Sequence, residues 1–259
     1  MMDFKLSQSK LRDWREMCPI EFKAKHIDKT WQFEPSIEME WGNYFETQCI
    51  GSTIGGAFSF AKSIHGEKML KSIFKERVDA QVLQYRKFKD IVCEKVLSRQ
   101  EYISTTVKDS TGQLIPIEGT IDMKWQLKSA KRAVMDLKLT GDTDNDFGKF
   151  AWGSPEKMDL SQIVHYGLLD KEYHKVEYPV TKYWVFDKGV DLKKKLIDVK
   201  VSENALYHHI ENLSEAYNEI SLAIAMDDWK PKNTYENCSK CKAPCKFQRI
   251  MPEDYIVEL

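Results

Sequence analysis

An unusually regular alternation of apolar and polar residues from Gln113 to Leu127 constrains the fold more than any other feature of the sequence. The apolar positions are Ile117, Gly119, Ile121, Met123, Trp125 and Leu127. The polar positions between them are Glu118, Thr120, Asp122, Lys124 and Gln126. Because successive side chains of a strand point to opposite faces, this pattern predicts a β-strand with one buried face and one polar face.

A second alternating segment, residues 132–140, follows after a short polar turn and predicts the other strand of a hairpin. Residues that face each other across this turn should have numbers that sum to about 259. This register is expected to be correct to within one residue. Asp122 should therefore lie opposite Asp136 or Leu137, with Lys138 on the same polar face as the two aspartates. Directly opposed carboxylates repel each other, and a cation between them would relieve that repulsion.

Helical spacing of apolar residues dominates the rest of the chain. Residues 36–50, 159–173 and 202–227 are predicted to be helices, and residues 182–187 and 195–201 are predicted to be strands. The predicted class is α/β, with a central mixed β-sheet flanked by helices. We expect a single domain over residues 1–259, with a helical insertion at about 51–98.

Charge and composition exclude several classes of protein. The 259 residues carry 39 basic and 40 acidic side chains, so a globally basic nucleic-acid coat is excluded. A nucleic-acid partner would be held by a local basic surface or by bound metal ions. No apolar stretch approaches the roughly 20 residues of a membrane helix. The first residues lack the features of a secretory signal, so we expect no membrane partner and a cytoplasmic, reducing location.

Cysteines near both ends of the chain suggest a metal site. Cys238, Cys241 and Cys245 form a C-x2-C-x3-C run among lysines, which favour the thiolate form. Cys18, near the end of a helix predicted over residues 6–26, is the best candidate for a fourth ligand. Four thiolates suit either zinc or a four-iron cluster. The alternative is that Cys18 is an ordinary buried thiol and the other three cysteines bind zinc with a histidine or water.

An ordered set of short motifs links the hairpin to both flanks. Gly42-x3-Glu46 precedes it, Gly119-Thr-Ile-Asp122 and Asp136-Leu-Lys138 lie within it, and Gln162-x3-Tyr166 follows it. Together with the cysteines, this order resembles the PD-(D/E)xK nuclease superfamily over residues 6–246. It is most similar to the RecB-type branch with an iron-sulfur cluster, such as the AddB-like and CRISPR-adaptation exonucleases. The resemblance implies a restriction-endonuclease-like core whose chain ends are joined by the four-cysteine site, with a 4Fe-4S cluster or, alternatively, Zn²⁺.

The resemblance also implies roles for individual residues. The ligands of Mg²⁺ or Mn²⁺ would be Glu46, Asp122, Asp136 and the backbone carbonyl of Leu137. Lys138 would orient the attacking water, and Gln162 and Tyr166 would position the substrate. Hard carboxylates suit these cations, which can activate water and neutralise a phosphate oxygen.

The implied activity is that of a metal-dependent deoxyribonuclease, an exonuclease or end-processing enzyme in recombination, repair or phage DNA metabolism. Its partners would be DNA with single-stranded character or ends, together with a helicase or recombination protein. A structure-selective endonuclease is a variant of the same hypothesis. The first alternative is a catalytically inactive nuclease-fold module that binds DNA or protein, and the second is a structural protein organised by its thiolate site.

Overall fold

The computed structural model describes residues 4–30, 34–51, 56–148 and 150–230. Contacts divide the chain into two compact units. The first unit comprises residues 1–34, 108–116 and 210–259, and the second comprises residues 35–107 and 117–209. The expectation of a single domain stays a prediction. No helix among the described residues is long and apolar enough to cross a membrane.

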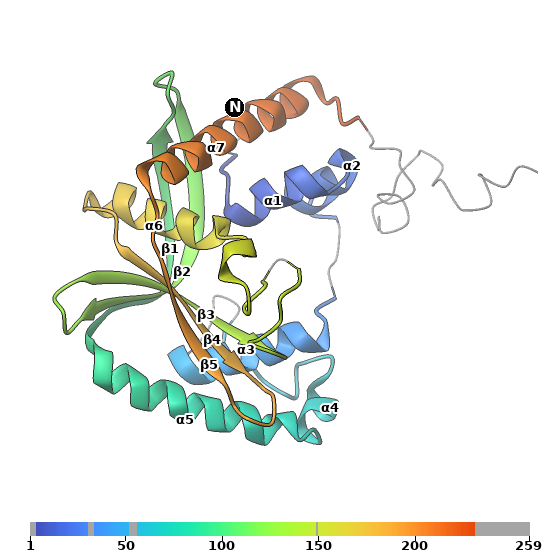
Figure 1. Cartoon of the computed structure of the whole chain (residues 1–259). Coiled ribbons are helices and arrows are strands. Elements are labelled where there is room, and N and C mark those ends of the chain that lie inside the picture. The colour runs from blue at the N-terminus through green and yellow to red at the C-terminus, as the bar shows by residue number, and fades with distance from the viewer. Residues whose placement is uncertain (1–3, 31–33, 52–55, 149, 231–259) are drawn as a thin grey trace, which may run out of the picture. The chain divides into compact units, whose positions relative to one another are not determined.

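A five-stranded mixed sheet forms the centre of the α/β fold (Figure 1). In spatial order its strands are β1 (Cys93–Lys108), β2 (Leu114–Leu127), β3 (Arg132–Thr140), β4 (Val180–Asp187) and β5 (Lys194–Val199). β3 pairs antiparallel with β2 and parallel with β4, and β4 pairs antiparallel with β5. In the predicted hairpin, Met123 pairs with Met135, so the partners' numbers sum to 258. The register therefore lies within one residue of the prediction.

Four helices accompany the sheet in the second unit: α3 (Ile37–Ile50), α4 (Gly66–Leu70), α5 (Phe74–Val92) and α6 (Ser161–His174). The Ser36 hydroxyl caps α3 by accepting a hydrogen bond from the Met39 N–H, as expected for a serine before a helix. Within the predicted helical insertion, α4 and α5 are helices. Cys93, in contrast, has extended backbone and begins β1, so the helical pattern ends earlier than predicted.

Opposite faces of the sheet meet different helices (Figure 1). Large residues of α3 and α5, among them Trp41, Phe45 and Tyr85, form one core with residues such as Trp125 and Trp184 of the sheet. α6 packs against β3 and β4. The predicted polar face is therefore covered, and two of its members, Lys124 and Asp136, are buried.

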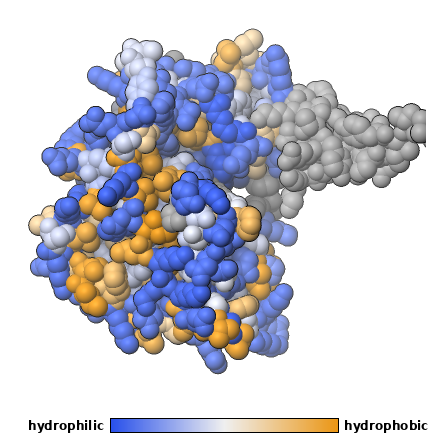
Figure 2. Space-filling model, viewed as in Figure 1, coloured by the Kyte–Doolittle hydropathy of each residue, from blue (hydrophilic) through white to orange (hydrophobic). Residues whose placement is uncertain are grey.

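A cavity of about 300 Å³ lies between the end of α5 and the sheet, away from the predicted polar face. Its lining includes Phe88, Ile91, Leu127, Met135 and Leu196. Met135 alternates with Asp136 along β3, so the cavity opens on the face opposite the carboxylate. Figure 2 shows apolar residues gathered over the middle of the viewed face among largely hydrophilic surroundings.

The first unit contains three short helical segments where one helix was predicted over residues 6–26. These are α1 (Gln8–Glu16), α2 (Pro19–Phe22) and a π-helix (Lys23–Ile27), and α7 (Glu203–Met226) continues into this unit from residue 210. Pro19 explains the break, because proline disfavours helical backbone in the preceding residue and is preferred at a helix start.

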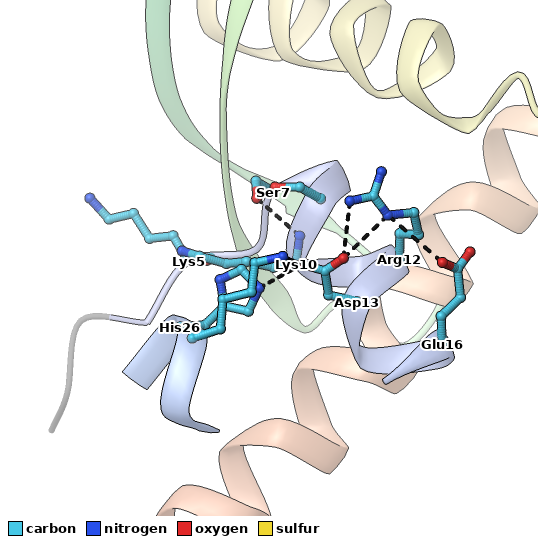
Figure 3. A network of polar contacts seen from close by, with 9 residues as sticks. Lys5, Ser7, Lys10, Arg12, Asp13, Glu16 and His26 are labelled. Atoms are coloured by element: carbon cyan, nitrogen blue, oxygen red, sulfur yellow. Dashed lines mark hydrogen bonds and ion pairs between the residues drawn. The ribbon is translucent and has the colours of Figure 1, made fainter. Parts of the chain in front are cut away.

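Buried Asp13 connects α1 to the π-helix (Figure 3). Its carboxylate accepts hydrogen bonds from Lys25 Nζ at 2.7 Å, His26 Nε2 at 2.8 Å and Arg12 Nη2 at 3.0 Å. Burial alone would raise the pKa of Asp13, but these three donors hold it well below its usual range. Asp13 is therefore the charged centre that fixes this turn of the chain.

Candidate active site

The predicted acidic pair lies where β2 separates from β3. Met123 and Met135 form the last pair in the register of the two strands on this side. Beyond it, the Leu137 N–H donates a hydrogen bond to the side-chain oxygen Oδ2 of Asp122, at 3.3 Å, and not to a backbone carbonyl of β2. Continuing the register by one residue sets Asp122 opposite Asp136, and their carboxyl groups hydrogen-bond to each other. The structure thus brings together the two aspartates that the hairpin pattern pairs.

Asp122 is poorly placed to carry a negative charge. Burial raises its pKa, and the nearby carboxylates of Asp136 and Glu46 raise it further, well above the usual range. Two adjacent carboxyl groups that share a hydrogen bond hold a proton between them more readily than two charges. A cation bound between the two aspartates would remove this conflict.

Lys138 supplies the positive charge beside the pair. Its Nζ lies 2.7 Å from Oδ2 of Asp136, whose side chain is 0% exposed. Burial would lower the pKa of Lys138, but Asp136 and Asp122 raise it more, so the pKa lies above its ordinary value. Lys138 is therefore an ammonium group, as the resemblance implies for a residue that offsets charge on a phosphate.

Glu46 reaches the same region from α3, but Gln100 holds it. Gln100 Nε2 donates a hydrogen bond to Glu46 Oε1. Burial raises the pKa of Glu46, and Asp136 adds to the effect. Gln100 has a φ of 47° within β1, a left-handed backbone conformation that is uncommon for residues other than glycine. Gln100 could not be recognised from the sequence, because nothing in a strand pattern marks a positive φ angle.

Asp122 and Asp136 are placed to bind a divalent cation, whereas Glu46 is not grouped with them as a third ligand. Asp136 Oδ2 is buried and lies 2.7 Å from Lys138 Nζ, and a carboxylate oxygen has a second lone pair that can bind a cation. The Leu137 carbonyl points to the same side of β3 as its N–H, toward Asp122. No three aspartate, glutamate, histidine or cysteine side chains among the described residues are grouped to hold one ion. Gln100 contacts Oε1 of Glu46, so Glu46 would complete such a group through Oε2 or by leaving Gln100.

One face of α6 runs along the polar side of β2 and β3. Gln162 and Tyr166 lie at its first end, where Gln162 Nε2 is 3.4 Å from Asp136 Oδ1 and 3.0 Å from the Tyr166 hydroxyl. Burial and the charges of Asp122 and Asp136 raise the pKa of Tyr166 well above its usual value. The predicted substrate-positioning pair therefore lies directly beside the acidic pair, with Tyr166 as a neutral hydrogen-bond donor.

The same face of α6 continues into a buried ion cluster that the sequence reading missed. Asp170 Oδ2 and Oδ1 accept hydrogen bonds from Arg132 Nε and Nη2, each at 2.6 Å, and Oδ1 lies 3.2 Å from Lys124 Nζ. Lys124, only 1% exposed, also pairs with Glu101. The four-residue spacing from Gln162 through Tyr166 to Asp170 is a signal that could have revealed this cluster.

Close packing at Gly119 brings α6 near β2. A Cβ atom at this position would lie 2.7 Å from Leu169 Cδ1, so any larger residue would require the buried Leu169 side chain to shift. His165 Nε2 donates a hydrogen bond to the Glu118 carbonyl at 3.0 Å, and its Nδ1 lies 3.2 Å from His209 Nε2. Burial lowers the pKa of His165 to about 4. His165 is therefore a neutral packing residue, and Gly119 sets the position of the helix that carries Gln162.

The predicted four-cysteine site lies largely outside the described residues. Cys18 is buried at the N-cap of α2. Cys238, Cys241 and Cys245 belong to the residues that the structure does not describe. The thiolate site stays a prediction.

Comparison with known proteins supports the fold. The sequence matches none of the protein-family models and none of the curated proteins with which it was compared. The crystal structure of a protein named "Putative exonuclease" from Eubacterium rectale is similar over 95% of this chain and 90% of that chain, with a TM-score of 0.63 and 14% identity. The structure of SSO0001 covers 93% and 84% of the two chains at 11% identity, with a TM-score of 0.39. At 14% identity, the first likeness shows a shared fold.

Proposed function

We propose that this chain is a metal-dependent nuclease that hydrolyses phosphodiester bonds in DNA. The observation that carries the proposal is the direct opposition of Asp122 and Asp136, with the Lys138 ammonium 2.7 Å from Asp136. Two carboxyl groups in this position strain the fold at neutral pH and suit a hard divalent cation. The fold shared with a protein named as an exonuclease supports the same activity.

Asp122, Asp136 and the Leu137 carbonyl would hold Mg²⁺ or Mn²⁺. Such an ion, when bound, lowers the pKa of a water molecule and neutralises a phosphate oxygen. Lys138, kept charged by the two aspartates, would orient the attacking water and stabilise the charge that develops on the phosphate. Glu46 would join the ligands through its Oε2 or after releasing Gln100.

Gln162 and Tyr166 would orient the DNA backbone. Their side chains hydrogen-bond to each other at 3.0 Å, and Gln162 also reaches Asp136, so the pair links the substrate side of α6 to the acidic pair. Because the pKa of Tyr166 is well above its usual value, its hydroxyl keeps its proton and can donate to a phosphate oxygen.

The test is cleavage of end-labelled single- and double-stranded DNA with Mg²⁺ or Mn²⁺ by wild-type protein and Asp136→Ala. We expect the variant to lose more than about 100-fold in rate, since even partners of metal ligands cost 10–100-fold. Asp191→Ala, which removes an exposed aspartate of the same unit, is the matched control and should leave the rate unchanged. Undiminished cleavage by Asp136→Ala would remove the assigned site. Circular substrates separate an endonuclease from an exonuclease.

A second candidate function is a nuclease-fold module that binds DNA or protein without cutting. The contact between Gln100 and Glu46 favours it, because no three potential ligands are grouped around one ion in the part of the chain that the structure describes. A tight DNA complex in EDTA, with no cleavage in any divalent metal, would support this function. Metal-dependent cleavage that Asp136→Ala abolishes would exclude it.

We also propose that Cys18, Cys238, Cys241 and Cys245 bind a 4Fe-4S cluster, with Zn²⁺ as the alternative. The support is their spacing in the sequence and the burial of Cys18. Protein purified without oxygen should be brown, and Cys18→Ser should lose the colour while Cys49→Ser keeps it. Colourless wild-type protein with stoichiometric zinc would establish the alternative, and protein with neither metal would refute the site.

A further inference from the structure

A loop after β3 carries aromatic side chains next to the acidic pair. Lys195 Nζ fixes this loop by donating hydrogen bonds to the Thr143 carbonyl at 2.7 Å and the Trp152 carbonyl at 3.2 Å. The Gly153 N–H donates to the Asn145 carbonyl at 2.8 Å and ties the two sides of the loop together. The described residues of the loop are therefore held by the sheet on which the acidic pair lies.

The aromatic rings extend outward from the acidic pair. Tyr183 pairs in register with Asp136, and its ring meets Trp152 edge to face at 5.6 Å. Trp152 stacks on Phe150 with ring centroids 5.0 Å apart and an interplanar angle of 3°. The Phe150 ring lies 5.9 Å from Lys138 Nζ. The loop therefore contacts the residue that we assign to the water and phosphate.

Phe147 is the exposed member of this aromatic loop. Its side chain is 81% exposed, the largest value among the exposed large apolar side chains of the described residues. Asn145 holds the backbone of Phe147 on both sides: its Oδ1 accepts from the Phe147 N–H at 3.2 Å, and its Nδ2 donates to the Phe147 carbonyl at 2.8 Å. A single exposed apolar side chain is common on protein surfaces, so what distinguishes Phe147 is a backbone held by Asn145 in the loop whose Phe150 ring contacts Lys138.

We propose that Phe147 is a stacking platform for an unpaired nucleobase close to the phosphate that is cleaved. This inference rests on the proposed function and specifies its substrate as single-stranded nucleic acid or a frayed end. Phe147 and Phe150 are three residues apart, so their Cα atoms lie within about 11 Å. A stacked strand rises about 3.4 Å per nucleotide, so this distance corresponds to about three stacked nucleotides.

Physical chemistry favours a single-stranded partner for such a ring. A base offers its flat face to an aromatic side chain only when it is unpaired and unstacked, and this interaction is insensitive to sequence. In a duplex the same faces are covered by neighbouring bases, and exposing one costs unstacking energy. The ring should therefore raise the rate on single strands and leave the rate on blunt duplexes nearly unchanged.

The first test compares cleavage of a labelled single-stranded oligonucleotide and a blunt hairpin duplex in Mn²⁺. We expect Phe147→Ala and Phe147→Leu to lose about 5- to 150-fold in kcat/KM on the single strand, and less than about threefold on the duplex. Phe147→Trp should retain the wild-type rate because it keeps a ring. Tyr207→Ala, which removes an exposed aromatic ring of α7, is the control and should change neither rate.

The second test measures stacking without cleavage. Oligonucleotides with one 2-aminopurine at successive positions are bound to wild-type protein in EDTA, and quenching of the fluorescent base reports stacking on a ring. We expect quenching at one or two adjacent positions with wild type and Phe147→Trp, and none with Phe147→Ala or Phe147→Leu.

The two tests separate this inference from the proposed function. Quenching that depends on the ring, in a protein that cleaves no DNA in Mg²⁺ or Mn²⁺, would sustain the stacking site and refute the nuclease. Wild-type cleavage rates and quenching in Phe147→Ala would refute the stacking site and leave the nuclease standing. Absence of quenching by the wild-type protein at every position would also refute the stacking site.

Discussion

The buried carboxylate of Asp170 offers the sharpest test of how α6 is held on the sheet. Asp170 is 0% exposed and accepts two hydrogen bonds of 2.6 Å from Arg132, with Lys124 Nζ 3.2 Å away. Asp170→Asn keeps the shape of the side chain and removes its charge. Arg132 would then lose its charged partner, and buried Lys124 would lose one carboxylate partner and keep Glu101.

Removing one partner of a buried ion pair costs about 3–5 kcal/mol. For a chain of this length each kcal/mol lowers Tm by about 2–4 °C, so the expected decrease is about 6–20 °C. Thermal and urea unfolding followed by circular dichroism measure it. Glu67→Gln neutralises an exposed carboxylate that pairs with Lys71 and should cost less than about 1 kcal/mol. If Asp170→Asn lost no more unfolding free energy than Glu67→Gln, the charges around Asp170 would be solvated. That result would refute the conclusion that this cluster is a buried ion pair holding α6 on the sheet.

The effect of Asp170 should also depend on pH. Burial alone would raise its pKa, but Arg132 and Lys124 outweigh burial and hold the pKa below its ordinary value. Its stabilising contribution is therefore complete above the pKa of the unfolded chain, about 3.9, and is lost as the pH falls through the lower folded value. The difference in stability between wild type and Asp170→Asn should be full at pH 7 and should shrink below about pH 4.

Three further substitutions test other parts of the structure. Gly119→Ala places a methyl group 2.7 Å from Leu169 Cδ1 and should cost about 1–3 kcal/mol in urea unfolding, with reduced cleavage because α6 carries Gln162. Asp13→Ala leaves three hydrogen-bond donors without their acceptor and should cost about 1–3 kcal/mol, measured in the same way. Asp122→Asn should stabilise the metal-free protein by about 0.5–2 kcal/mol, because the amide can still accept from Leu137 and can donate to Asp136. Since the folded-state pKa of Asp122 is raised, wild-type stability is lost as pH rises through that pKa, so this gain should appear at pH 8 and vanish in acid. Asp122→Asn should also abolish the increase in Tm that Mn²⁺ gives the wild type.

Much of the sheet could be predicted because its signal is local. Alternation along β2 and β3, with a short turn between them, fixes both the pairing and the register to within one residue. The opposition of Asp122 and Asp136 follows from that register alone. Helix α3 could be predicted as well, because an apolar stripe and Ser36 mark its body and its start.

Other features depend on contacts that sequence spacing does not encode. The alternation predicted a polar face on β2 but not that α6 covers it. In the structure Lys124 is buried on this face, where Asp170 on α6 compensates its charge. Gln100 meets Glu46 through a reversed backbone angle in β1, which no residue pattern announces. The helix predicted over residues 6–26 is broken at Pro19, because the local restriction that proline imposes outweighs the apolar periodicity.

The polar face of α6 has two ends with opposite electrostatic character, and this contrast separates folding from chemistry. At Asp170 each buried charge has a partner of opposite sign, so this end anchors the helix. At Gln162 and Tyr166 the helix meets Asp122 and Asp136, whose charges repel, and Lys138 is the cationic residue beside them in the part of the chain that the structure describes. If the acidic pair binds a divalent cation, as we propose, its unfavourable metal-free arrangement has to be held in place by other contacts, and the Asp170 cluster on the same helix would supply them. Asp170→Asn should therefore lower both the affinity for the cation and the free energy of unfolding. Asp122→Asn should also lower the affinity for the cation, but it should raise the free energy of unfolding.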